Sequence, residues 1–154
     1  MKRVAIFSIG LALLSAGCGS TQTRVYEVAT QTSVFEVAVG QCFNDPGDDL
    51  ESEGGLVKVD TVDCTEPHDN EFYSIYSMTD SSFPGVTIAH ELAYQECMVR
   101  FDSYVGRDYW SSSLDIRAII PTHESWKNGD REVLCFLYDL EFDLLTRSAK
   151  ASGL

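Results

Sequence analysis

The sequence predicts one small α+β domain, with an antiparallel sheet of about four or five strands, one packed helix and two disulfides. Short stretches in which apolar and polar residues alternate indicate half-buried strands. One longer stretch, in which apolar residues recur every three or four positions, indicates a helix with an apolar face. The 154 residues, 44% of them hydrophobic, suit one globular domain and exclude a chain that is disordered throughout.

Three strands are expected before the helix. The first should cover residues 35–42, because Phe35, Val37 and Val39 occupy alternate positions. The second should cover residues 57–61, where apolar residues again alternate with polar ones. Residues 45–55, between these two strands, are rich in Asp, Pro and Gly, which favour turns. The third expected strand covers residues 72–78, which are mostly aromatic and β-prone.

The helix should cover residues 89–105, where the apolar positions share one face. Thr87 is a candidate N-cap, and Gly106 is expected to end the helix.

Two further strands should follow, over residues 114–120 and 133–137. Between them we expect a short helical turn at His123 and Glu124, and then a tight turn at Asn128-Gly129. The sheet is therefore expected to be antiparallel.

The amino-terminal residues have the order of an export signal. Lys2 and Arg3 precede an apolar run that is too short to span a bilayer, and small residues then lead to Cys18. We expect residues 1–17 to be a lipoprotein signal peptide and Cys18 to carry acyl chains such as palmitate. An ordinary secretory signal with an incidental cysteine is the alternative. The expected location is the extracytoplasmic face of the cell membrane, to which the lipid on Cys18 would anchor the chain.

The residues that follow Cys18 are mostly Thr, Gln, Ser and Gly, so residues 18–33 should form the lipidated cysteine and a flexible tether. An edge strand at residues 26–29 is the alternative. The domain should then cover residues 34–150, with residues 151–154 as a tail.

The chain is strongly acidic, with a formal net charge of -13. Binding to nucleic acid and electrostatic binding to anionic lipid headgroups both need clusters of Lys and Arg, which the sequence lacks. We therefore expect no nucleic-acid partner, and we also expect no cofactor.

Four cysteines remain once Cys18 is assigned to lipid, and three pairings are possible. Cys97 lies on the apolar face of the expected helix and Cys135 on the core side of an expected strand. Cys42 and Cys64 end two strands that a hairpin would bring together. The positions favour Cys42 with Cys64 and Cys97 with Cys135, over a zinc site that would use Cys64 and His68.

Several short motifs are spread over residues 39–150. Residues 39–44 read Val-Gly-Gln-Cys-Phe-Asn, residues 62–71 read Val-Asp-Cys-Thr-Glu-Pro-His-Asp-Asn-Glu, and residues 129–135 read Gly-Asp-Arg-Glu-Val-Leu-Cys. Together with Phe83-Pro84-Gly85 and Ser125-Trp126, they resemble the septum formation family of Gram-positive envelope proteins. The resemblance implies an envelope role linked to division and supplies no established activity. Arg147 and Ala151 depart from it, because glycines would be expected there.

His68 is the strongest catalytic candidate, because Glu66, Asp69 and Glu71 could orient it as a general base. No nucleophile motif accompanies it, so a turn after Cys64 whose side chains bond local backbone amides is the favoured interpretation. Glycoside hydrolysis needs a pair of carboxylates, but in so acidic a chain the presence of such a pair is little evidence for that activity. We therefore expect a protein that is not an enzyme.

A calcium site is the remaining metal hypothesis. Asp49, Glu51, Glu53 and Asp60 follow the ligand spacing of an EF-hand loop. The flanking segments are expected to be strands and not helices, so an acidic hairpin tip is favoured over a metal site.

A partner surface is proposed for the exposed charged and aromatic residues Glu66, His68, Asp69, Trp126, Asp130 and Arg131, although Trp126 could equally be core. The sequence thus predicts a lipid-anchored, extracytoplasmic interaction module of the cell envelope, with an envelope protein as partner and a link to septum formation or cell division. A small-ligand or calcium-binding lipoprotein and an envelope hydrolase that uses His68 or paired acids are the alternatives.

Overall fold

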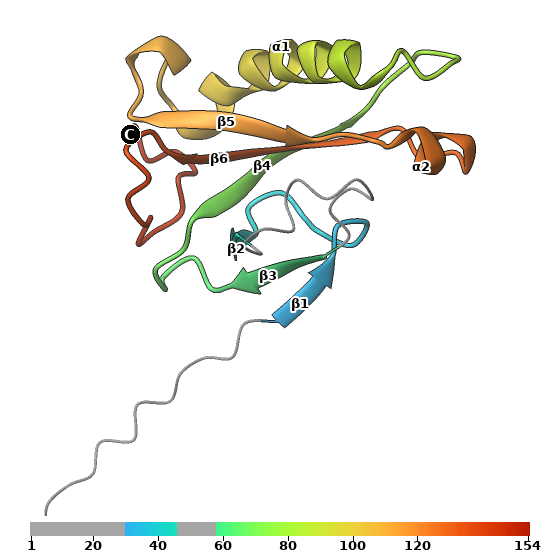
Figure 1. The fold of residues 1–154 in the computed structure, drawn as a ribbon. Coiled ribbons are helices and arrows are strands. Elements are labelled where there is room, and N and C mark those ends of the chain that lie inside the picture. Colours follow the sequence, from blue (N-terminus) through green and yellow to red (C-terminus); the bar gives the residue numbers. More distant parts are fainter. Residues whose placement is uncertain (1–29, 46–57) are drawn as a thin grey trace, which may run out of the picture.

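The computed structural model describes residues 30–45 and 58–154, which form one antiparallel sheet with a long helix on it (Figure 1). The six strands lie in the order β1-β3-β2-β4-β6-β5. Their bounds are β1 Thr30–Ser33, β2 Cys42–Asn44, β3 Lys58–Val62, β4 Asn70–Ser77, β5 Leu114–Ile119 and β6 Glu132–Asp139. The helices are α1 Val86–Val105 and α2 His123–Lys127, and a 3-10 turn, η2, covers Tyr109–Ser111. The expected α+β class with an antiparallel sheet is confirmed.

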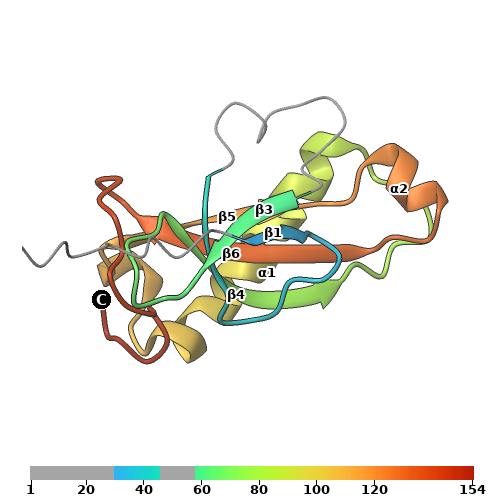
Figure 2. The ribbon, with the colours of Figure 1, turned by 90° about the horizontal axis from the view of Figure 1, so that it is seen from below.

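The sheet has a separate core on each face. On one face, α1 covers β4, β5 and β6 (Figure 1) and buries Cys97 and Phe101 against Ile116 and Leu137. On the other face, β1, β2 and β3 curve beneath β6, as the view from below shows (Figure 2). The curvature encloses a second core, in which the rings of Phe43 and Phe72 stack with centroids 4.4 Å apart. Each fully buried Phe side chain contributes about 1.5–3 kcal/mol to stability.

The helix α1 confirms the expected apolar face. Its buried residues, Ala89, Ala93, Cys97, Phe101, Tyr104 and Val105, recur at three and four positions. Gly106 adopts a left-handed conformation with φ of 82° and ends the helix, as expected. The N-cap is Gly85 without a side-chain hydrogen bond, so the assignment of the cap to Thr87 is wrong: α1 begins at Val86, which places Thr87 inside the first turn.

The expected strand over residues 35–42 is wrong for all but its last residue. The chain turns there twice, with hydrogen bonds from the Glu36 N–H to the Ser33 carbonyl and from the Gln41 N–H to the Ala38 carbonyl. Gly40, with φ of 91°, then directs the chain into β2. Phe35 is consequently 61% exposed, and the apolar alternation that predicted a strand belongs to a loop.

The residues on either side of that loop supply the strands. Residues 30–33, which the sequence assigned to the tether, form β1 and pair with β3, from Thr30 opposite Thr61 to Ser33 opposite Lys58. Folded structure therefore includes the last four residues of the expected tether.

The later elements follow the sequence closely. The strands β3, β4, β5 and β6 coincide with the expected segments to within a few residues, and α2 begins at His123 as expected. Residue 57, the first of the expected second strand, lies outside the described residues.

Two disulfides join the pairs that the sequence favoured, Cys42 with Cys64 and Cys97 with Cys135. The second bond fixes α1 to β6, which lies between β4 and β5, and both of its cysteines are fully buried. Oxidised cysteines leave no thiolate for the zinc hypothesis.

The carboxyl-terminal segment is integrated into the fold. Leu145 exchanges two backbone hydrogen bonds with His68, at 2.8 and 2.9 Å. Further along, the Ala151 N–H donates to the Tyr104 carbonyl and the Gly153 N–H to the Val105 carbonyl, at the end of α1. Residues 151–154, expected as a tail, therefore pack on the domain.

Candidate functional site

His68 lies inside the protein and not in a cleft. Its side chain is fully buried, and its Nδ1 lies 2.7 Å from the Glu66 carbonyl oxygen. Within the described part of the chain, its Nε2 has no hydrogen-bond partner. Because the ring is sealed from solvent and its backbone is bonded to Leu145, the assignment of His68 to a partner surface is wrong, and no substrate could reach it as the structure stands.

A turn follows Cys64, as the favoured interpretation expected, but the side chain that bonds a local backbone amide there is that of Asp63. Asp63, just before Cys64, accepts hydrogen bonds from the backbone N–H and the hydroxyl of Thr65, both at 2.8 Å, which lower the pKa of the Asp63 carboxyl. Asp69 is half-buried and accepts from the Asp45 N–H at 3.0 Å, tying this turn to the end of β2. Of the three residues of this turn that were expected on a partner surface, Glu66, His68 and Asp69, only Glu66 is exposed.

Glu71 does not orient His68. Its buried carboxylate accepts from the Tyr104 hydroxyl at 2.5 Å, from the Ser148 hydroxyl at 2.6 Å and from the Ala149 N–H at 2.6 Å. The sequence contained no signal for this role, because the donors come from α1 and from the carboxyl-terminal segment.

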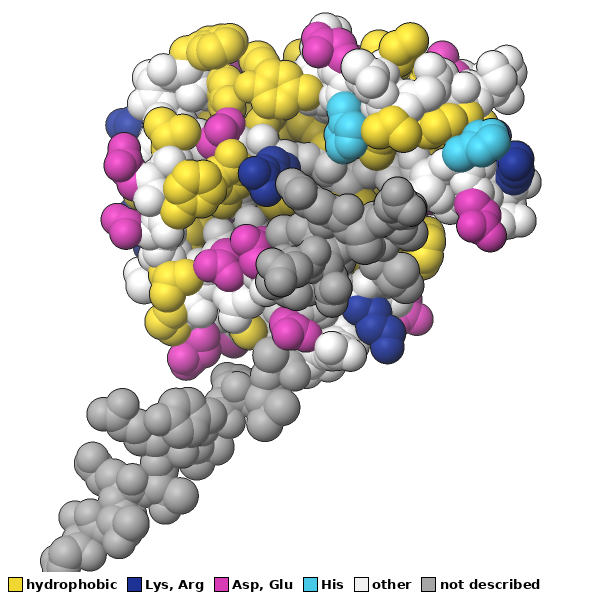
Figure 3. Space-filling view, viewed as in Figure 1, with side chains coloured by type: hydrophobic (Ala, Val, Ile, Leu, Met, Phe, Trp, Pro, Cys, Tyr) yellow, Lys and Arg dark blue, Asp and Glu magenta, His cyan; other side chains and the backbone are white. Residues whose placement is uncertain are grey.

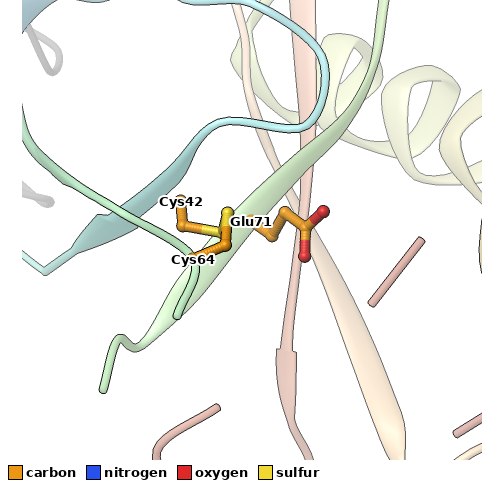
Figure 4. Close-up of side chains that lie close together, drawn as sticks. All are labelled: Cys42, Cys64 and Glu71. Carbon is orange, nitrogen blue, oxygen red and sulfur yellow. A yellow bond between two sulfur atoms is a disulfide. The ribbon is translucent and has the colours of Figure 1, made fainter. Parts of the chain in front are cut away.

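Glu71 also lies beside the disulfide between Cys42 and Cys64 (Figure 4). These three residues are the one group in the described residues with the proximity of metal ligands, their candidate atoms all lying within 4.8 Å of one another. Both sulfurs are consumed by the disulfide and the carboxylate by its three donors, so the arrangement is structural.

The calcium hypothesis can be examined only at Asp60. This residue lies within β3, opposite Asn44 of β2 and Gln31 of β1. Asp49, Glu51 and Glu53 lie outside the described residues.

Trp126 is core and not surface, so its assignment to a partner surface is wrong. It is buried against the ring of Phe83, with centroids 5.5 Å apart, and the Arg131 guanidinium covers its ring at 3.7 Å. Asp130 and Arg131 are half-buried and line an open depression near the start of β6.

The six expected surface residues also belong to two separate places. Asn70 pairs with Tyr138 at one end of the ladder between β4 and β6, and Ser77 pairs with Glu132 at the other end. Because a strand rises about 3.3 Å per residue, the turn at His68 and the depression at Arg131 are more than about 20 Å apart. The two places therefore lie at opposite ends of the sheet.

Exposed apolar side chains that were not expected from the sequence lie at the end of the sheet where β5 begins and β6 ends. We call this group of residues the end surface; it consists of Trp110, Leu140, Phe142 and Leu144. Trp110 is 78% exposed and Phe142 is 75% exposed, and the Phe142 ring stacks on Tyr138 with centroids 5.5 Å apart. Hydrophobic and acidic side chains lie side by side at this end of the molecule, on the left in Figure 3. Residues 140–144, in which apolar and acidic residues alternate, were the signal available in the sequence.

A hydrogen-bond network supports the end surface from within. Asp115 of β5 accepts from the hydroxyls of Tyr109 at 2.5 Å and Tyr138 at 2.9 Å, and from the Ile116 N–H at 2.8 Å. Burial opposes ionisation of Asp115, but these hydrogen bonds outweigh it and lower its pKa. Burial, reinforced by the bond to Asp115, raises the pKa of Tyr109. The network therefore holds neutral tyrosines around a charged carboxylate.

These features define the class: a small, disulfide-bonded α+β domain that displays apolar surface. The family model described as septum formation matches residues 10–135. The chain therefore belongs to the septum formation family, as its motifs indicated, and this membership suggests an envelope-associated protein. No curated protein and no solved structure matches the chain. Within residues 30–45 and 58–154, no helix has the length and apolarity to cross a membrane.

Proposed function

We propose that this protein is a lipid-anchored, extracytoplasmic interaction module of the cell envelope that binds another envelope protein during septum formation. Family membership supports the link to the septum. The export signal and Cys18 support the lipid anchor. The acidic net charge supports a partner that is a protein and not a nucleic acid or an anionic lipid surface.

The end surface is the single observation that carries this proposal. Aromatic residues are enriched in the contacts that contribute most to binding between proteins, and Trp110 and Phe142 present most of their area to solvent. Phe142 also has φ of 61°, a left-handed conformation that is uncommon for a residue with a bulky side chain. A strained and exposed aromatic residue is costly to keep, and a binding role would account for it.

We propose that the module works without catalysis. Among the described residues, the strongest catalytic candidate, His68, is buried and engaged with the backbone. An envelope hydrolase that uses His68 would need this turn to open and release Leu145.

The test is the position of fluorescently tagged protein in growing cells, with each variant expressed at the same level. We expect wild type to be enriched at mid-cell, Cys18→Ala to leave the membrane, and the double variant Trp110→Ser with Phe142→Ser to stay on the membrane without mid-cell enrichment. The matched control is Ile88→Ser with Val99→Ser, which removes two exposed apolar side chains from α1. A uniform distribution of wild type, or equal loss in the control, would contradict the proposal.

A further inference from the structure

An open depression lies at the opposite end of the sheet from the end surface. It has a volume of about 720 Å³. It lies between the end of β4, the helix α2 and the start of β6. We call it the Arg131 depression. The residues of its lining that matter to the argument are Phe35, Met78, Asn128, Asp130, Arg131 and Glu132.

The cation in this depression is held in a fixed position. The central carbon of the Arg131 guanidinium lies over the Trp126 ring, 3.7 Å from its centroid, and Nη1 donates to the carbonyls of Trp126 at 2.8 Å and Asp130 at 2.6 Å. The Nε and Nη2 donors have no protein partner within the described part of the chain. A pre-organised guanidinium with free donors loses little entropy when it binds a ligand.

Arg131 has no acidic partner among the described residues, although the protein is strongly acidic. Acidic residues outnumber Lys and Arg by 24 to 11 in the sequence, yet the one ion pair among the described residues joins Arg100 to Glu96. Asp130 and Glu132 flank Arg131 in the chain but do not pair with it, and Asp130 accepts from the Glu132 N–H instead. The guanidinium fork is therefore available to an external acceptor.

The surroundings of Arg131 restrict the chemistry of that acceptor. Arginine binds carboxylate and phosphate through two parallel hydrogen bonds. The neighbouring carboxylates of Asp130 and Glu132 would repel a doubly charged phosphate more strongly than a singly charged carboxylate. Phe35, which is 61% exposed, and Met78 supply apolar contact beside the charge.

We propose that the Arg131 depression binds the terminal carboxylate of a peptide with apolar side chains. The carboxylate pairs with the free donors of Arg131, the apolar side chains contact Phe35, and the acidic rim accepts the adjacent peptide N–H. This site is distinct from the end surface, so the peptide proposal and the proposed function are tested independently.

The test is a titration of the full chain, isotopically labelled and in detergent, with N-acetyl-Leu-Ala. We expect the nuclear magnetic resonance signals of the Trp126 indole N–H and the Gly129 amide to shift on saturation. The same peptide with an amidated carboxyl end should bind at least tenfold more weakly, and inorganic phosphate should bind more weakly than the free-acid peptide.

Two variants localise the site. Arg131→Lys keeps the charge but loses the fork, and we expect at least fivefold weaker binding. Phe35→Ser changes an exposed side chain that the fold does not need, and should weaken binding at least threefold. The control is Arg117→Lys, because Arg117 also lies over an aromatic ring, 5.5 Å from the centre of the Tyr138 ring. This variant should bind the peptide as tightly as wild type does. Equal binding of acid and amide, equal binding by Arg131→Lys, tighter binding of phosphate, or no binding at all would each overturn the proposal.

Discussion

Replacing Glu71 with glutamine should destabilise the protein strongly, although the change removes no volume. The Glu71 carboxylate is fully buried and accepts from Tyr104, Ser148 and Ala149. A glutamine amide has one acceptor oxygen in place of two. If that oxygen keeps the Tyr104 and Ser148 hydroxyls, the NH₂ group faces the Ala149 N–H, which cannot accept a hydrogen bond from it. Glu71→Gln therefore leaves at least one buried donor unsatisfied and weakens the other two contacts.

The magnitude follows from the number of contacts. A hydrogen bond to a charged group contributes about 1.5–3 kcal/mol, a neutral one about 1 kcal/mol, and an orphaned buried donor costs about 1–3 kcal/mol. One lost and two weakened bonds give a decrease of about 3–5 kcal/mol in the free energy of unfolding. Since small domains have about 5–15 kcal/mol in total, this is a large share.

The assay is equilibrium unfolding in urea with both disulfides intact, followed by far-ultraviolet circular dichroism. Ser148→Ala removes one of the three donors and should cost about 1–2 kcal/mol. Glu132→Gln, at an exposed carboxylate, is the matched control and should lie within about 0.5 kcal/mol of wild type. A free energy for Glu71→Gln within about 1 kcal/mol of wild type would refute the reasoning, because it would mean that the three contacts contribute little.

Three further predictions concern the rest of the fold. Removing the disulfide with Cys97→Ser and Cys135→Ser opens a loop with a separation of 38 residues and should cost about 3–4 kcal/mol in the same urea assay. Ala151→Gly should raise the free energy of unfolding by about 0.5–1 kcal/mol and the melting temperature by about 1–4 °C. Ala151 has φ of 53°, and glycine relieves that strain at an entropic cost smaller than the strain itself. An unchanged or lower melting temperature would contradict this. Burial raises the pKa of Tyr73 and Tyr104, so these hydroxyls ionise more readily in the unfolded chain. Stability should therefore be fully present below pH 10, the ordinary tyrosine pKa, and decline as the pH rises above it; urea midpoints that stay constant from pH 9 to about 11 would argue against it.

Local patterns predicted most of the secondary structure. The apolar face of α1 and the cysteine on it followed from helical spacing, which predicted the pairing of Cys97 with Cys135. The same reasoning failed at residues 35–42, because a loop with two turns can bury Val34 and half-bury Val37 while exposing Phe35. Alternation predicts a strand only if the chain remains extended.

The candidate site was less predictable, because burial depends on contacts that are distant in sequence. The polar turn predicts an exposed His68, but Leu145 pairs with it and buries it. The sequence leaves Trp126 either exposed or buried, and in the structure Phe83 and Arg131 enclose it. The sequence proposed Arg131 for a partner surface, but the free donors of its guanidinium are visible only in three dimensions. The departure at Ala151 from the family pattern proved informative, because its backbone adopts the conformation that glycine favours.

The hydrogen bonds from Ser148 and Ala149 to Glu71 have a consequence for the order of events during synthesis. The two ends of this contact are 77 and 78 residues apart in the chain. A ribosome delivers Glu71 well before it delivers Ser148 and Ala149, so the buried carboxylate cannot have all its contacts satisfied until those two residues have emerged. Folding around Glu71 should therefore be completed late in synthesis. That delay suits the export that our proposal of a lipid-anchored, extracytoplasmic protein requires.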